Sequence, residues 1–174
     1  MVSRSSAVII RWKNCGCVLS SAGTNSDRES LLLQCARLLP GYSMLGSQTV
    51  SRRGNGQPFF PDCPELHLSI SRCDGCIAAA ASTSEVAVDI EAPGALDSAF
   101  VRAVSTDSEW EHFCCSPDPS EAFCGLWTKK EAALKCSGVG LLGTGQLKSA
   151  LMDTRCEIRT WRVENVILSL ARLP

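Results

Sequence analysis

Short apolar runs alternate with polar segments along the chain, and their spacing predicts a set of β-strands. Six runs have the length or the two-residue period of strands: 7–12 (AVIIRW), 66–71 (LHLSIS), 76–82 (CIAAAAS), 85–91 (EVAVDIE), 156–163 (CEIRTWRV) and 166–173 (VILSLARL). The first run is expected to form an edge strand. The Gly- and Pro-rich segment 51–65 is predicted to be a loop.

Three other segments have the spacing of helices. Apolar residues of 27–41 recur every three or four positions, and a second helical region is expected around 100–114. The third helix, within 118–138, carries signals for both of its ends: Asp118 as N-cap, Pro119 at the first position, Glu121 completing a capping box, and Gly138 as terminator. Each half of the chain thus runs from helix to strands, which predicts an α+β fold of two similar halves, 1–84 and 85–174.

The charge balance limits the possible partners. The chain has 17 Lys and Arg against 18 Asp and Glu, a net charge of -1, so non-specific nucleic-acid binding is not expected and any phosphate site must be local. No apolar run is long enough to span a bilayer, and the N-terminal segment does not resemble an export signal. These features predict a cytoplasmic protein without membrane contact.

The chain contains 11 cysteines, an odd number that favours reduced thiols over a disulfide framework. Cys63, His67, Cys73 and Cys76 have the residue types of a zinc site, and Cys73 and Cys76 have its two-residue gap. Only half of a CxxC…CxxC signature is present, however. A Cys/His zinc module therefore stays open as one alternative, beside buried or incidental thiols.

The third helix has an unusual apolar stripe. On a helical wheel Phe123, Leu126, Trp127 and Leu134 lie on one face, Lys130 falls inside it, Glu131 lies at its edge, and Lys135 follows one turn later. A Glu131–Lys135 pair at (i, i+4) would stabilise the helix by roughly 0.3–0.5 kcal/mol. Such a pair accounts for the spacing but does not explain why Lys130 faces inward.

Carboxylates also gather on one face of the strand 85–91. Val86, Val88 and Ile90 point to one side of this strand, which leaves Asp89 and Glu91 on the other. One interpretation is a solvated strand face. The other joins these two carboxylates with Glu131 into a site for a hard cation, beside lysines that neutralise phosphate.

At these positions the sequence resembles the 4′-phosphopantetheinyl transferases, in particular their larger single-chain subtype of two related halves. VAVDIE (86–91) resembles the family marker (I/V)GIDIE, and WTKKEAALK (127–135) matches the marker W-x-x-K-E-(A/S)-x-x-K. Upstream, GQPFFPDCPELHLSIS (56–71) is similar to the GKP…SHS region, 27–41 to an early arginine-bearing helix, and 156–171 to the closing strands. The resemblance covers nearly the whole chain.

The resemblance implies a pseudo-symmetric α+β enzyme, a monomer with its active site between the halves. Such an enzyme moves the phosphopantetheine arm of coenzyme A onto a serine of an apo-carrier protein and releases 3′,5′-ADP. Asp89, Glu91 and Glu131 would hold Mg²⁺ or Mn²⁺, Glu131 would be the base, and Lys135 would stabilise the leaving phosphate. The residues expected to contact coenzyme A are Arg28, Gln57, Pro58, Ser69, Ser71 and Lys130.

The sequence departs from the family pattern at two positions. Gln57 stands where GKP has lysine, and Ile70 stands where SHS has histidine. Both changes remove cationic contacts to coenzyme A. A transferase-like binding or regulatory protein with weakened catalysis is therefore a further alternative.

Overall fold

The computed structural model describes residues 7–20, 27–73, 75–138, 144–152 and 154–174. Its strands are β1 (Val8–Trp12), β2 (Cys15–Ser20), β3 (Ser51–Arg52), β4 (Pro58–Phe59), β5 (His67–Cys73), β6 (Cys76–Ser82), β7 (Val86–Glu91), β8 (Glu157–Val163) and β9 (Val166–Arg172). Its helices are α1 (Asp27–Arg37), α2 (Ser98–Val104), α3 (Asp107–Cys115), α4 (Pro119–Cys136) and α5 (Thr144–Ser149).

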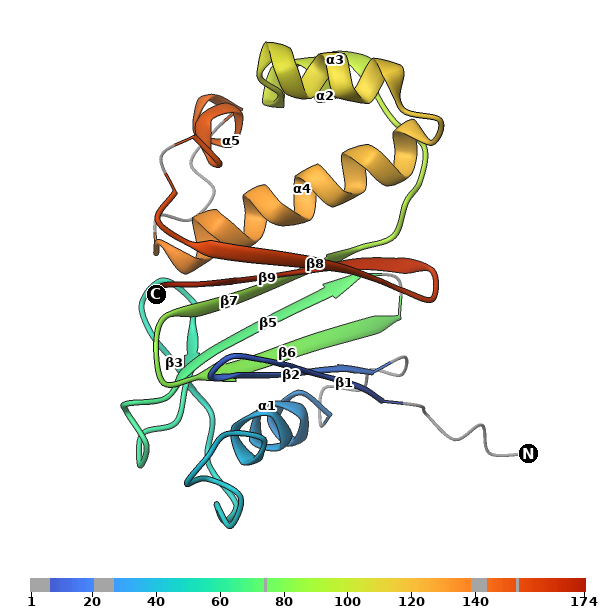
Figure 1. The fold of residues 1–174 in the computed structure, drawn as a ribbon. Coiled ribbons are helices and arrows are strands. Elements are labelled where there is room, and N and C mark those ends of the chain that lie inside the picture. Colours follow the sequence, from blue (N-terminus) through green and yellow to red (C-terminus); the bar gives the residue numbers. More distant parts are fainter. Residues whose placement is uncertain (1–6, 21–26, 74, 139–143, 153) are drawn as a thin grey trace, which may run out of the picture.

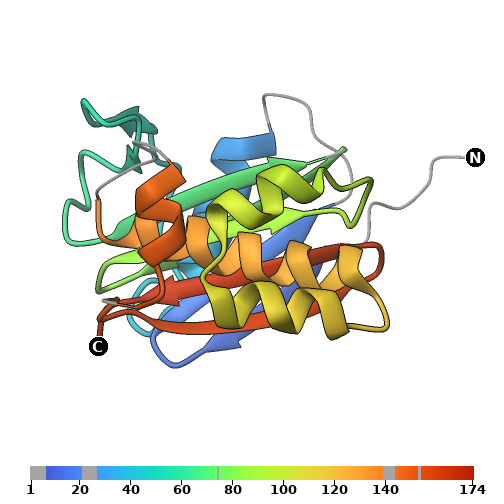
Figure 2. The same cartoon turned by 90° about the horizontal axis from the view of Figure 1, so that it is seen from above.

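These elements form layers (Figure 1). The first sheet has the order β1-β2-β6-β5 and the second the order β7-β9-β8, and neighbouring strands in both are antiparallel. Helix α1 covers the outer face of the first sheet, and α4 covers the outer face of the second. Viewed from above, α2, α3 and α5 lie over α4 (Figure 2). The α+β class predicted from the sequence is confirmed.

Both faces of the central strands are buried, which explains their nearly continuous apolar sequences. Alternate residues of β6 contact different neighbours: Ala79 and Ala81 pack toward α1, whereas Ala78 and Ala80 pack toward the second sheet. In β7, Val86, Val88 and Ile90 face the first sheet, and Ala87 faces α4. The alternation predicted for β7 is therefore confirmed, and it places Asp89 on the α4 side.

The two sheets are also joined across β5 and β7. The backbone N–H of Val88 donates to Ser69 Oγ at 3.0 Å, and both groups are buried. The first sheet is built from residues of the predicted N-terminal half and the second from the C-terminal half. The division at 84/85 and a twofold relation between the halves stay predictions.

Some elements differ from the sequence-based expectation. The region around 100–114 forms two helices, because Ser105 and Thr106 are extended and Thr106 caps α3. The predicted loop 51–65 contains the β3–β4 hairpin, and β2 and α5 were not predicted. All six predicted strands are present, and β1 is an edge strand as expected.

The ends of α4 follow most of the predicted signals. The side chain of Asp118 accepts from the Glu121 N–H at 2.9 Å, and Pro119 opens the helix. Gly138, at φ +72°, follows its end in a conformation that favours glycine. The predicted capping box forms only its first contact, from the Glu121 N–H to the Asp118 side chain. The prediction of the return contact was wrong, because the Glu121 carboxylate forms an ion pair with Arg162 on β8 instead of accepting from the Asp118 N–H.

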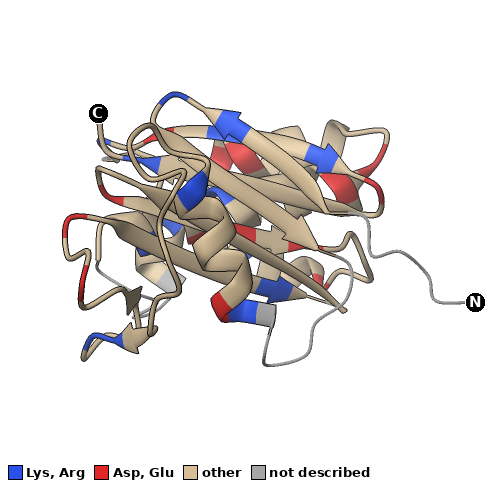
Figure 3. Ribbon diagram, turned by 90° about the horizontal axis from the view of Figure 1, so that it is seen from below, with Lys and Arg blue, Asp and Glu red and all other residues tan. Residues whose placement is uncertain are grey.

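Charged residues are distributed over both halves. Seen from below, Lys and Arg are interspersed with Asp and Glu over the described elements (Figure 3). This mixture agrees with the net charge of -1 and leaves local pockets as the places where a phosphate could bind.

Candidate functional site

Helix α4, strand β7 and strand β5 bring three of the predicted site residues together: Lys135, Asp89 and Ser71. The Lys135 ammonium lies 2.6 Å from Asp89 Oδ1, and the Ser71 hydroxyl on β5 donates to the same oxygen at 2.8 Å. Lys135 Nζ also lies 3.5 Å from Ser71 Oγ. The partner of Lys135 is therefore on β7, and the interpretation of Lys135 as half of a helix-surface pair with Glu131 does not describe this contact.

Burial makes this cluster electrostatically costly. Asp89 is 3% exposed and Glu131 is 4% exposed. Burial raises the pKa of Asp89, and the Lys135 ammonium offsets part of that rise. Burial together with the Asp89 carboxylate raises the pKa of Glu131 to about 7, with Glu91 adding to the rise and Lys135 opposing it. The site thus holds more carboxyl groups than Lys135 could neutralise if all of them were ionised.

This excess of carboxylate fits a hard cation. Asp89 Oδ2 is a buried oxygen without a hydrogen-bond partner, and such an atom is expensive unless something coordinates it. Oxygen donors without thiolate are the ligand set of Mg²⁺ or Mn²⁺. Within the described part of the chain, however, no three His, Cys, Asp or Glu side chains already stand close enough to hold a metal ion. The three carboxylates of the predicted set, Asp89, Glu91 and Glu131, would have to move closer together to bind one ion.

A pocket of about 210 Å³ opens beside Lys135, and three of the predicted coenzyme A contacts of the first half, Gln57, Pro58 and Ser69, line it. Gln57 and Pro58 from the β3–β4 hairpin, Ser69 and Ile70 from β5, and Lys135 all line it. The two positions that depart from the family pattern, Gln57 and Ile70, therefore face one pocket. A larger space of about 630 Å³ continues from Gln57 and Lys135 toward α5 and Cys156.

Arg52 is a lining residue of the smaller pocket that the sequence did not place. Its guanidinium donates to the Gly56 carbonyl at 2.7 Å, which folds the side chain back along the hairpin. Arg53 instead lies over the Phe59 ring, 5.0 Å from its centroid. The pairing of β3 with β4 decides which of these two arginines faces the pocket. The sequence predicted only a loop for this segment, and a loop prediction does not say which side chains lie on the same face.

Lys130 does not join the cluster around Asp89. Its side chain is fully buried, and its ammonium lies 2.8 Å from Glu109 Oε2 on α3. It also donates to the carbonyls of Val104, Leu147 and Lys148 at 3.0, 2.8 and 3.2 Å. These contacts direct its ammonium into the layer of α2, α3 and α5, and they do not favour the expectation that Lys130 lies near the phosphates with Lys135, which stays a prediction.

The sequence model of one family matches residues 85–172, about half of the chain, and that family is described as the 4′-phosphopantetheinyl transferase superfamily. The chain belongs to this superfamily. The matched residues include Asp89, Glu91, Glu131 and Lys135. The hairpin and β5 residues that line the smaller pocket precede the match.

Three curated members of the superfamily are similar to this chain. The 4′-phosphopantetheinyl transferase psf-1 of Bacillus pumilus is 30% identical over 90 residues, 51% of this chain and 39% of that protein. A 4′-phosphopantetheinyl transferase of Bacillus subtilis is 33% identical over 92 residues, which cover 49% of this chain and 39% of that protein. The transferase Sfp of Bacillus subtilis (strain 168) is 24% identical over 124 residues, 63% and 55%. The alignments thus span about two fifths to just over half of these relatives.

Arg28 is the predicted coenzyme A contact that lies in a different layer from the cluster of Asp89, Glu131 and Lys135. It lies half-buried in the first turn of α1, on the outer face of the first sheet, whereas Asp89, Glu131 and Lys135 come from β7 and α4. Ser69 and Ser71 lie on β5 beside the cluster.

The zinc alternative finds no support in the geometry. Cys63 is buried in the core between α1 and the first sheet, and His67 Nδ1 lies 3.1 Å from Glu85 Oε1. Cys63, His67, Cys73 and Cys76 do not form a group able to hold a metal ion, a statement that covers the described residues. Over the same residues, no helix is long and apolar enough to cross a membrane.

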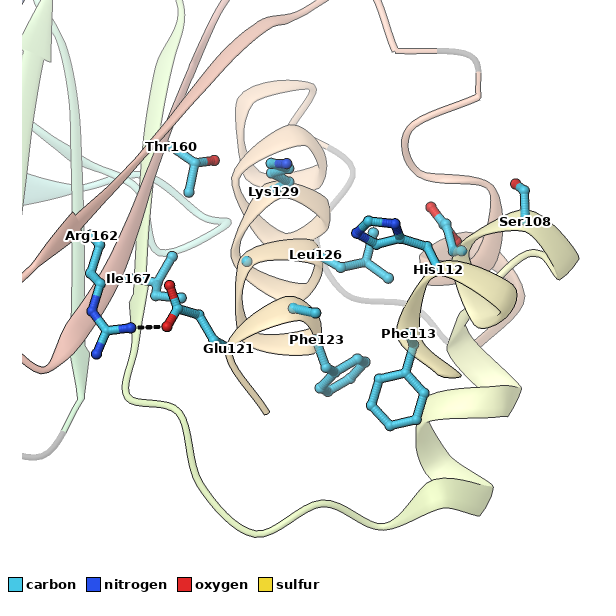
Figure 4. Close-up of a pocket in the computed structure, with 13 residues that line it drawn as sticks. Ser108, His112, Phe113, Glu121, Phe123, Leu126, Lys129, Thr160, Arg162 and Ile167 are labelled. Carbon is cyan, nitrogen blue, oxygen red and sulfur yellow. Dashed lines mark ion pairs between the residues drawn. The ribbon is translucent and has the colours of Figure 1, made fainter. Parts of the chain in front are cut away.

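A separate cavity lies on the other side of α4, between α3 and β8 (Figure 4). It has a volume of about 460 Å³, and the Glu121–Arg162 ion pair lies at one side of it. Lys129, the exposed neighbour of Lys130, and Glu109 both line this cavity. Two adjacent lysines of α4 therefore have different surroundings, one facing the cavity and the other buried behind its wall.

Proposed function

We propose that this protein transfers the 4′-phosphopantetheine arm of coenzyme A to a serine of an apo-carrier protein and releases 3′,5′-ADP. The observation that carries the proposal is the cluster of the buried Asp89 and Glu131 with the exposed Lys135, in which a carboxyl with a pKa of about 7 lies beside a lysine and an unpartnered carboxylate oxygen. Membership of the superfamily supports the same reaction.

In this proposal Glu131 is the general base and Lys135 stabilises the leaving group. The carrier serine oxygen attacks the phosphorus that bears the pantetheine arm, and the bond from that phosphorus to 3′,5′-ADP breaks. Glu131 takes the serine proton, directly or through a water, for which a pKa near 7 suits a base working near neutral pH. Lys135 exchanges its contact with Asp89 for the departing phosphate oxygen and lowers the energy of the developing charge.

Asp89, Glu91 and Glu131 would hold Mg²⁺, or Mn²⁺, in this site. When bound, the ion supplies charge neutralisation on the pyrophosphate. Transfer is expected to stop in EDTA and to return when Mg²⁺ is added back. Full transfer by protein from which metal has been removed would refute the three-carboxylate assignment.

The nucleotide part of coenzyme A would enter the pocket beside Lys135. Gln57 and Pro58 would contact it from the hairpin and Ser69 from β5, with Ser71 at the border of the cluster. Arg28 is kept as a proposed contact from the first half. The active site would then lie between two related halves of a cytoplasmic monomer that binds neither nucleic acid nor membrane.

A second candidate function is a transferase-like binding or regulatory protein that turns over slowly. It is favoured by Gln57 and Ile70, which place no cation in the pocket where the family pattern has lysine and histidine. Coenzyme A binding without transfer would support this candidate over the first.

The deciding experiment incubates the protein with coenzyme A, Mg²⁺ and a panel of apo-carrier proteins. Mass spectrometry of the carriers is expected to show the phosphopantetheine increment on one serine. A carrier variant with alanine at that serine is the matched control, and it should remain unmodified. Absence of the increment from every carrier, with measurable coenzyme A binding, would replace the first candidate by the second.

A further inference from the structure

Lys130 lies where the ends of three helices meet. Val104 is the last residue of α2, and Leu147 and Lys148 belong to the last turn of α5. All three present their carbonyl oxygens to the Lys130 ammonium within 3.2 Å. Glu109, in the first turn of α3, supplies the fourth oxygen.

This arrangement matches the chemistry of a lysine. The last carbonyls of a helix have no partners within the helix, and the negative end of the helix dipole favours a cation there. Glu109 Oε2 also accepts from the Thr106 N–H at 2.7 Å, so one carboxylate oxygen joins the start of α3 to Lys130. An ammonium has three hydrogens to donate, and these acceptors are enough to satisfy all of them.

The contacts constrain α4 as well as its neighbours. Successive residues of a helix point about 100° apart, so the direction of Lys130 determines the direction of Glu131. With Lys130 held among α2, α3 and α5, the buried Glu131 is directed toward the β7 side of α4, where Ala132 and Cys136 pack against Ala87. One turn later Lys135 reaches Asp89 from the same helix.

We propose that Lys130 is a positioning residue: its four contacts fix the rotation of α4 and so aim Glu131 and Lys135 at Asp89. The proposal rests on the transferase function proposed above, and it assigns Lys130 a role without contact to coenzyme A. A positioning residue acts on kcat, because a displacement of the catalytic groups of about 1 Å costs up to about 100-fold in rate. A phosphate contact would instead act on coenzyme A binding.

The test compares Lys130→Met with Glu109→Gln, the double variant, and Lys129→Met as the matched control. Lys130→Met keeps the length of the side chain and removes its charge. Glu109→Gln weakens the same Lys130–Glu109 contact from the α3 side. Both single variants are expected to lower kcat about 10- to 100-fold, while the Kd for coenzyme A stays within about threefold of wild type. The kcat of the double variant should be no lower than that of the worse single variant, because both substitutions disrupt the same contact between Lys130 and Glu109. Lys129→Met should retain the wild-type kcat.

Two results would overturn the proposal. One is a Lys130→Met protein with a normal kcat and a Kd for coenzyme A raised about tenfold or more, the behaviour of a lost phosphate contact. The other is a folded Glu109→Gln protein with wild-type kcat. Glu109→Gln also decides the matter if Lys130→Met fails to fold: glutamine keeps the size of the side chain and can still accept from the Thr106 N–H, so the variant is expected to fold, but it removes the negative charge that holds the Lys130 ammonium.

Hydrogen exchange separates this proposal from the proposed function. If the wild-type protein transfers nothing, the proposed function fails, and exchange in α4 still tests the positioning role. Faster exchange around Glu131 in Glu109→Gln, but not in Lys129→Met, would support it. Equal exchange in the two variants would refute it.

Discussion

Replacing Glu131 by glutamine should stabilise the protein when no divalent cation is present. Burial and the neighbouring Asp89 and Glu91 carboxylates raise the pKa of Glu131 to about 7, against an ordinary value of 4.5. The folded state therefore holds this proton more tightly than the unfolded state does. Ionising Glu131 in the folded protein costs up to about 3 kcal/mol at pH 8, and glutamine removes this cost.

The sign of the effect gives it a clear pH dependence. Below the ordinary pKa of 4.5 the carboxyl is protonated in both states and costs nothing. As pH rises toward 7, the unfolded state ionises first and the free energy of unfolding falls. The stabilisation by Glu131→Gln should thus be small at pH 4.5, grow with pH, and level off at pH 8, at about 3 kcal/mol as an upper limit.

The assay is urea unfolding in EDTA at several pH values, with Glu111→Gln, an exposed change on α3, as the matched control. Added Mg²⁺ should then raise the free energy of unfolding of the wild type, but much less that of Glu131→Gln, which has lost a proposed ligand. Transfer by the folded Glu131→Gln protein should be abolished. A difference between wild type and Glu131→Gln that is independent of pH, or a less stable variant at pH 8, would refute the electrostatic account of this site.

Three other predictions use the same structure. Lys135→Ala should fold and mainly lower kcat, by roughly 10²–10³-fold, measured by carrier modification; a near-normal kcat would exclude leaving-group stabilisation. Gln57→Lys with Ile70→His should lower the KM for coenzyme A, each restored charged hydrogen bond contributing roughly 1.5–3 kcal/mol; an unchanged KM in the folded protein would show that these positions are not deficits. Hydrogen bonding from Cys136, with further help from Thr154 and Arg155, lowers the pKa of Cys156 to about 6. Iodoacetamide labelling of Cys156, followed by peptide mapping, should therefore reach half its maximal rate near that pH, and a midpoint near an ordinary thiol pKa would contradict this.

The sequence alone determined the features that depend on neighbours within a few positions. The two-residue period of β7 placed Asp89 and Glu91 on the face opposite Val86, because strand side chains alternate. The caps of α4 followed from Asp118 and Gly138, since each acts within one turn. The helical wheel likewise put Lys130 inside the helix face that becomes buried.

Only the tertiary structure decided which partners these residues have. Lys130 lies in the sequence 21 positions from Glu109, and Lys135 lies 46 from Asp89. The helical period predicts that the Lys130 ammonium points inward, where it needs a partner. It does not determine whether that partner is a bound phosphate or the ends of α2, α3 and α5. The choice depends on how the helical layer packs over α4, because a buried charge without partners is costly and this packing gives Lys130 four oxygen partners.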